Sequence, residues 1–236
     1  MSVDTNPTLD RLPEPAAILF DLDGTLVDTV PVRIAAWCRA LEAAGIPADP
    51  KRMGGYIGSD GRWLASEFAR AAGRVLDYAE SEELDHVAGA IFNDLNVSPA
   101  PLPGATALLT ALEESGLTFA IATSSRPAQV SVSVAALRLP SPPPITDGSH
   151  VAKAKPAPDL LLASAAQIGV SPERCWYVGD STWDMQAAVA AGMVAIGVPS
   201  GAVDAGVLLG AGANATVGTL QDLLVELRRR GLLAAE

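Results

Sequence analysis

Two aspartates stand two residues apart at the end of the first apolar run of the chain. The run covers residues 16–20, and Asp21 and Asp23 follow it in the segment FDLDGTLVDT. Carboxylates held this close repel each other, and burial strengthens the repulsion. A fold retains such a pair where a cation, a shared proton or a reaction requires it, so both residues are candidates for catalysis or metal binding.

Other polar side chains are expected at the same end of the fold. In chain order they are Thr123, Ser124, Lys155, Asp180 and Asp184. Most of them come directly after predicted strands, and in an open parallel sheet the ligands bind at the carboxyl ends of the strands. Carboxylates suit a hard cation, and the cation together with a lysine offsets their mutual repulsion. The set therefore predicts a site for Mg²⁺ and phosphate.

Short apolar runs alternate with amphipathic helical patterns, which is typical of a parallel sheet covered by helices. The expected strands are residues 16–20, 118–122, 175–178 and 194–198, with a weaker one around Ile145. The expected helices are residues 105–114, 127–137, 159–168, 184–191 and 220–229. This order of elements predicts the α/β fold class.

One segment interrupts the alternation. Between residues 32 and 99 the sequence shows helical patterns at 32–44, 62–72 and 82–95 and no convincing strand. The segment 96–104, NVSPAPLPG, then has the composition of a linker. We therefore expect a helical cap over 32–99, inserted into a core made of 1–31 and 100–236.

Composition narrows the class of protein. The chain has 236 residues, 49% hydrophobic and 18% charged, with a formal net charge of −11. Such an acidic chain is expected to repel nucleic acid and anionic membranes. Two isolated cysteines indicate a reducing compartment, and the polar N-terminus lacks the order of a signal peptide. We expect a cytoplasmic protein without a nucleic-acid or membrane partner, and the oligomeric state stays open.

Four segments together resemble a known family. They are DLDGTLVD, IATSS, KPAPD and VGDSTWDMQAA, and they match in order the four motifs of the haloacid dehalogenase-like superfamily. The likeness is to its Mg²⁺-dependent phosphatase branch with a helical cap, of the phosphoglycolate phosphatase and β-phosphoglucomutase type. It covers about residues 16–227 and implies a Rossmann-like core.

The resemblance implies a role for each motif residue. Asp21 would be the nucleophile that forms an aspartyl phosphate, and Asp23 the general acid and base. Thr123 and Lys155 would hold the phosphate oxygens, assisted by backbone N–H groups around Leu22 and Ser124. Mg²⁺ would be bound by the carboxylate of Asp21, the backbone carbonyl of Asp23, and Asp180. Asp184 would bind it through water or orient that shell.

The sequence departs from the family pattern at some positions. The glycine usual before the motif lysine is Ala154, and Lys153 is a second candidate beside Lys155. The mutase relatives tend to carry a histidine twelve residues after the nucleophile, where this chain has Arg33. Arg33 and Arg62 are each interpreted as a cation facing the substrate or as a surface charge.

The expected function is the hydrolysis of a small phosphorylated metabolite of the phosphoglycolate or sugar-phosphate type. The presence of Asp23 favours phosphoryl transfer over dehalogenation, since dehalogenases of the superfamily replace it. A phosphomutase or a phosphonate-processing relative is the nearest alternative. A non-catalytic partner-binding protein on the same scaffold is the alternative from another class.

Overall fold

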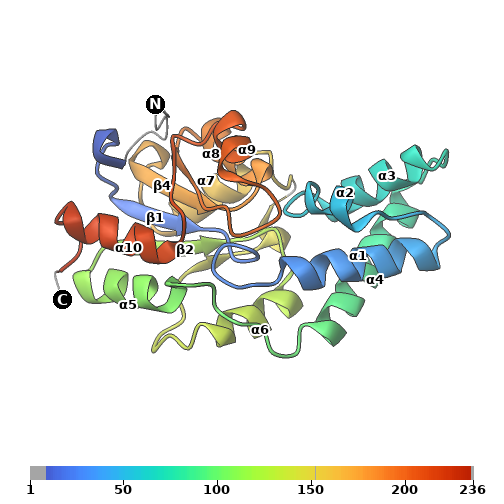
Figure 1. Cartoon of the computed structure of the whole chain (residues 1–236), viewed down its shortest axis with the longest axis horizontal. Coiled ribbons are helices and arrows are strands. Elements are labelled where there is room, and N and C mark those ends of the chain that lie inside the picture. Colours follow the sequence, from blue (N-terminus) through green and yellow to red (C-terminus); the bar gives the residue numbers. More distant parts are fainter. Residues whose placement is uncertain (1–8, 152, 235–236) are drawn as a thin grey trace, which may run out of the picture.

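A parallel sheet forms the centre of the molecule (Figure 1). The computed structural model describes residues 9–151 and 153–234. Within these residues, six parallel strands lie in the order β3-β2-β1-β4-β5-β6. They are β1 (Ala17–Phe20), β2 (Thr118–Ala122), β3 (Ile145–Thr146), β4 (Cys175–Gly179), β5 (Val194–Gly197) and β6 (Ala215–Thr216). The predicted α/β fold with a parallel sheet is confirmed, including the weak strand at Ile145.

Helices cover both faces of the sheet. On one face lie α5 (Ala105–Ser115), α6 (Pro127–Ala136) and α10 (Leu220–Arg229), and on the other α7 (Asp159–Gln167), α8 (Thr182–Ala190) and α9 (Ala205–Gly210). Successive strand residues point to opposite faces. In β1, Ile18 and Phe20 therefore pack with the first group of helices, and Ala17 and Leu19 with the second. This burial on both faces explains the continuous apolar runs of the sequence.

Four helices lie beside the sheet rather than on its faces (Figure 1). They are α1 (Val30–Ala43), α2 (Pro50–Gly54), α3 (Gly61–Ala71) and α4 (Tyr78–Leu95). They bury a hydrophobic cluster of their own, with Trp37, Leu41 and Phe68 among its members. Among the described residues 32–99 no strand is present, as the sequence predicted. The boundaries of the core and cap stay predictions. Residues 1–8, 152 and 235–236, which fall in the expected core, lie outside the described residues.

Some elements differ from those expected. The sequence did not predict β6, α2 or α9, because two to six residues are too few to show a periodic pattern. Helix α8 begins at Thr182 rather than at residue 184, because the Ser181 hydroxyl accepts a hydrogen bond from the backbone N–H of Asp184. Asp184 thus lies in the first turn of α8, and its carboxylate accepts from the N–H of Ser181. This capping box fixes the orientation of Asp184.

No helix among the described residues is long and apolar enough to cross a membrane.

Candidate active site

The carboxyl ends of β1, β2 and β4 meet at one edge of the sheet. Phe20 pairs with Ile121 of β2 and with Val178 of β4. Asp21 therefore follows β1 at the level where β2 ends before Thr123 and β4 ends before Asp180. The register of three strands brings together motif residues that are more than 150 positions apart in the chain.

Lys155 lies at the centre of this edge. Its ammonium donates hydrogen bonds to Oδ1 of Asp21 at 2.6 Å and to Oδ1 of Asp184 at 2.7 Å. The hydroxyl of Tyr177 lies 3.2 Å from the same nitrogen. Lys155 is only 2% exposed, whereas Lys153 is exposed on the surface. Of the two lysines left open by the sequence, the structure places Lys155 at the site.

Three buried carboxylates form a compact cluster. Asp21, Asp180 and Asp184 each offer an oxygen, and these oxygens lie within 4.8 Å of one another. The Thr25 hydroxyl donates to Asp180 at 2.8 Å. The backbone also approaches Asp180 closely at Gly24, which has a φ of +89°, and a Cβ at that position would clash with the carboxylate. Oxygen ligands in a small cluster of this kind suit a hard divalent cation.

The pKa shifts of the cluster show that a further positive charge would stabilise its carboxylates. Burial raises the pKa of the Asp21 carboxyl to about 7, although the Lys155 ammonium opposes the shift. Burial also raises the pKa of Asp180, and the charges of Asp184 and Asp21 raise it further. Burial by itself would lower the pKa of Lys155, but the two carboxylates outweigh it and raise that pKa. One ammonium does not balance three buried carboxylates, so the residues present fit a divalent cation.

The carboxylate of Asp23 has separate partners. Thr29 donates to it at 2.7 Å, Nη2 of Arg33 donates at 2.9 Å, and the Ser125 hydroxyl donates to the same oxygen as Arg33. The Arg33 guanidinium also lies over the ring of Phe92, 3.9 Å from its centroid. With its side chain 14% exposed, Arg33 is not a solvated surface charge. Arg33 holds the carboxylate of Asp23, the candidate acid–base group, in place. A direct contact of Arg33 with the substrate stays a prediction.

The predicted phosphate-binding groups line the same edge. Thr123 is buried, and its hydroxyl accepts a hydrogen bond from the N–H of Ser125 at 3.1 Å. The Ser124 hydroxyl is buried and has no hydrogen-bond partner within residues 9–151 and 153–234. Among the described residues, the backbone N–H groups of Leu22 and Ser124 donate no hydrogen bond within the protein. These groups remain available to an anion.

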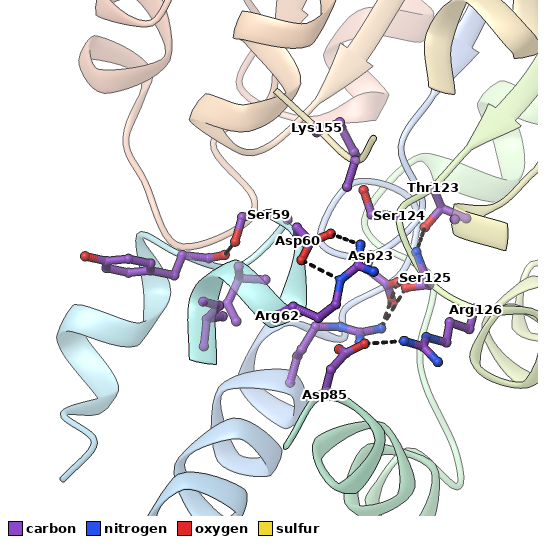
Figure 2. Close-up of a pocket in the computed structure, with 18 of the residues that line it drawn as sticks. Asp23, Ser59, Asp60, Arg62, Asp85, Thr123, Ser124, Ser125, Arg126 and Lys155 are labelled. Atoms are coloured by element: carbon purple, nitrogen blue, oxygen red, sulfur yellow. Dashed lines mark hydrogen bonds and ion pairs between the residues drawn. The ribbon is translucent and has the colours of Figure 1, made fainter. Parts of the chain in front are cut away.

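A cavity of about 410 Å³ opens between the sheet edge and the helices α1, α3 and α4. Figure 2 shows Lys155 on one side of it and the pair formed by Asp85 and Arg126 on another. Arg62 lines the cavity as well, but Asp60 holds it through two hydrogen bonds of 2.7 and 3.2 Å. With its side chain 34% exposed and paired with Asp60, Arg62 lies at the rim of the cavity, and the choice between its two interpretations stays open.

Sequence reasoning missed several groups at the site. Tyr177 falls within a predicted strand, although a buried tyrosine hydroxyl needs a partner and thus signals a polar neighbour. Ser125 belongs to the segment IATSS, which by itself assigns it no role. The charged residues Asp60, Glu82, Asp85 and Arg126 carried no signal, because only the packing of helices brings them to the cavity.

Comparison with known proteins agrees with this geometry. The sequence model of the haloacid dehalogenase-like hydrolases matches residues 15–192. A β-phosphoglucomutase of Bacillus subtilis (strain 168) is 32% identical over 191 residues, which cover 78% of this chain and 84% of that protein. Hexitol phosphatase A of Escherichia coli (strain K12) is 31% identical over 77% of this chain and 83% of its own length.

A solved structure supports the same conclusion. The crystal structure of a hydrolase from Pseudomonas syringae has a TM-score of 0.85 and 34% sequence identity, covering 90% of this chain and 98% of that one. The likeness therefore extends over most of the chain. Together with the match of residues 15–192, it shows that the chain belongs to the haloacid dehalogenase-like hydrolase family.

Proposed function

We propose that this protein is a Mg²⁺-dependent phosphatase that hydrolyses a small phosphomonoester through an aspartyl phosphate on Asp21. The observation that carries the proposal is the contact of 2.6 Å between Asp21 and Lys155 at the wall of the cavity, beside two more buried carboxylates. A carboxylate oxygen and an ammonium at one spot supply a nucleophile and a group that binds the phosphate. The phosphatase named among the relatives supports this class of reaction.

The first half of the reaction transfers the phosphoryl group to the protein. A carboxylate oxygen of Asp21 attacks phosphorus, and the bond between phosphorus and the ester oxygen breaks. The departing oxygen takes a proton from the carboxyl group of Asp23 and leaves as an alcohol. Thr29 and Arg33 restrain Asp23 in one orientation for this step. Lys155, Thr123 and the free N–H groups hold the phosphoryl oxygens.

The second half returns the protein to its starting state. Asp23, now a carboxylate, takes a proton from a water molecule, and the water oxygen attacks phosphorus. The bond between phosphorus and Asp21 breaks, and inorganic phosphate leaves. Asp23 lies two residues after the nucleophile Asp21. From this position its carboxylate can serve both the departing alcohol and the attacking water.

The metal would be held by Asp21, Asp180 and Asp184 together with the backbone carbonyl of Asp23. When bound, Mg²⁺ neutralises charge between the anionic nucleophile and the anionic phosphate. The buried cluster of three carboxylates supports a divalent ion in general, and the choice of Mg²⁺ is part of the proposal. The cytoplasmic location also stays a prediction.

A phosphomutase is the second candidate, because one relative is named β-phosphoglucomutase. Arg33 favours hydrolysis, since mutase relatives tend to carry histidine there. A mutase would convert a sugar 1-phosphate to its isomer without net release of phosphate. Measuring released phosphate and isomerised product in one assay separates the two reactions.

The test of the proposal is hydrolysis of p-nitrophenyl phosphate with Mg²⁺, repeated with excess chelator and with Asp21→Asn. We expect turnover that the chelator abolishes and that the variant lacks, while circular dichroism shows an intact fold. Asp94→Asn is the matched control, because it removes the same charge from an exposed position. Near-normal activity in Asp21→Asn contradicts the assignment of Asp21 as the nucleophile. A lack of turnover in the wild type favours the alternative of a non-catalytic partner-binding protein. A phosphonate-processing enzyme would instead cleave a carbon–phosphorus bond.

A further inference from the structure

Five charged side chains line the part of the cavity formed by the cap and by the loop after β2. We call them the cap-side cluster: Asp60, Arg62, Glu82, Asp85 and Arg126. Asp60 caps the N-terminus of α3, Arg62 lies on α3, Glu82 and Asp85 lie on α4, and Arg126 precedes α6. Figure 2 shows the Asp85–Arg126 pair on the far side of the pocket from Lys155. A substrate with its phosphate at Lys155 would extend its organic part toward this cluster.

Both arginines of the cluster are already paired. Arg126 contacts Glu82 at 2.8 Å and Asp85 at 2.6 Å. Arg62 contacts Asp60 at 2.7 Å, donates to the Tyr78 hydroxyl at 3.1 Å and lies 3.7 Å from Glu82. Arg33, which also lines the cavity, is paired with Asp23. Among the described residues, the cavity therefore offers no unpaired cation to a second anionic group of a substrate.

The cluster also holds more negative than positive charge, with three carboxylates against two guanidinium groups. A substrate carboxylate or second phosphate placed there would meet net repulsion in a partly desolvated space. Burial already raises the pKa of Asp85 despite the opposing charge of Arg126. An additional anion would increase the electrostatic repulsion at Asp85, whereas a neutral group would not.

Hydroxyl groups, in contrast, find acceptors at the cluster. The Oε2 atom of Glu82 lies 3.7 Å from Nη1 of Arg62 and has no hydrogen-bond partner within the part of the chain that the structure describes. A carboxylate offers about four lone-pair sites, so an ion-paired carboxylate still accepts hydrogen bonds from hydroxyls. A site with unpaired hydrogen-bond acceptors discriminates strongly against ligands that lack hydrogen-bond donors.

The size of the cavity points the same way. The volume of about 410 Å³ lies within the range of about 300–1,000 Å³ that is usual for pockets that bind small molecules. A two-carbon substrate such as phosphoglycolate would leave most of this space filled with water. A phosphorylated chain or ring of five or six carbons fills it far better.

We propose that the organic part of the substrate is a neutral polyhydroxylated chain or ring, recognised by the carboxylates of Glu82 and Asp85. The inference rests on the proposed phosphatase function and adds the substrate class to it. Substrates with a carboxylate or a second phosphate are disfavoured because the arginines of the cluster are already neutralised.

The first test compares two substrates with the wild-type enzyme and Mg²⁺. We expect kcat/KM for D-glucitol 6-phosphate to exceed that for 2-phosphoglycolate by about tenfold or more, the value of one hydrogen bond to a charged group. An equal or reversed preference, with p-nitrophenyl phosphate still hydrolysed, overturns the inference and leaves the phosphatase function standing. No hydrolysis of any of the three overturns the phosphatase function and the inference with it.

The second test changes the carboxylates. In Glu82→Gln/Asp85→Asn, the ratio of kcat/KM for D-glucitol 6-phosphate to that for 2-phosphoglycolate should fall by about tenfold. Glu83→Gln is the matched control, because Glu83 is the exposed neighbour on α4 and does not line the cavity. The control should keep the wild-type ratio. An unchanged ratio in the double variant overturns the inference.

The third test separates recognition from cap closure, because the same ion pairs join α4 to the core. Arg126→Gln breaks these pairs but adds net negative charge, so the ratio should stay the same or rise. If Arg126→Gln and the double variant instead lower kcat/KM for all substrates equally, the pairs serve only to close the cap. That result overturns the assignment of substrate class.

Discussion

Two groups of charged residues, one at the inner end of the cavity and one on its cap side, use the same residue types in different ways. The core carboxylate set (Asp21, Asp180, Asp184 and Lys155) is almost fully buried, and burial raises the pKa of Asp21 to about 7. In the cap-side cluster, burial likewise raises the pKa of Asp85, whereas at Asp60 the hydrogen bonds with Arg62 and with the N–H of Trp63 outweigh burial and lower the pKa. The side chain of Asp60 is 25% exposed.

The difference shows that burial and the balance of charge, rather than residue type, decide what a carboxylate requires. The core set holds three carboxylates around one ammonium, an arrangement that fits a bound cation. The cap-side cluster supplies two guanidinium groups of its own for its three carboxylates. The first arrangement suits a dianionic phosphate with its metal, and the second suits a neutral organic group.

The largest effect should follow the loss of the ammonium from the core set. Lys155→Met removes the only cation in contact with Asp21 and Asp184 in the described structure. Activity should fall by about 10²–10³-fold. In the metal-free protein, breaking the buried pair should lower the free energy of unfolding by about 3–5 kcal/mol. Phosphatase assays and urea unfolding measure the two effects.

Lys153→Met is the matched control for this variant, because Lys153 lies two residues away and is exposed. It should change the activation free energy and the free energy of unfolding each by less than about 0.5 kcal/mol. Equal losses in the two variants would contradict the placement of Lys155 at the site.

A smaller effect should appear in the pH dependence of the metal-free protein. Burial raises the pKa of Asp21 to about 7 in the folded state, from 3.8 for an ordinary aspartate side chain. Between these values the folded state binds more protons than the unfolded state. Stability from this group is therefore present below about pH 4 and is lost as pH rises to about 7. Added divalent ion, which binds the carboxylates, should stabilise the protein more at pH 8 than at pH 5.

Urea unfolding in chelator at several pH values measures this effect, with Asp21→Asn as the reference that lacks the titrating group. The difference in unfolding free energy between wild type and variant should decrease from pH 4 to pH 7. A difference that stays constant over this range would show that Asp21 titrates normally and would remove the contrast with Asp60.

The smallest effect should follow a change in the cap-side cluster. Arg62→Gln breaks the ion pair with Asp60, but both side chains are partly exposed to solvent. Solvent screening limits such a pair to about 0–1 kcal/mol, so the melting temperature should shift by only a few degrees. A loss as large as that in Lys155→Met would mean that the two regions do not differ as described.

Much of the fold and of the core site follows from local patterns. The strand that ends before Asp21 and the strand that ends before Asp180 are apolar runs of ordinary length, and parallel pairing brings their ends together. The motif order therefore predicted the meeting of Asp21, Lys155, Asp180 and Asp184, which the structure contains. Short elements such as β6 were missed because two residues show no period.

The sequence by itself determined the parallel sheet, the cap helices and the carboxylates at the sheet edge, since these depend on periodicity and on the ends of strands. Only the tertiary structure decided that Lys155 rather than Lys153 faces Asp21, that Arg33 holds Asp23, and that Glu82 and Asp85 meet Arg126. These contacts depend on how the loop that carries Lys155 and the helices beside the sheet are placed against the rest of the core, and the direction of a side chain across such an interface is set by packing rather than by local pattern.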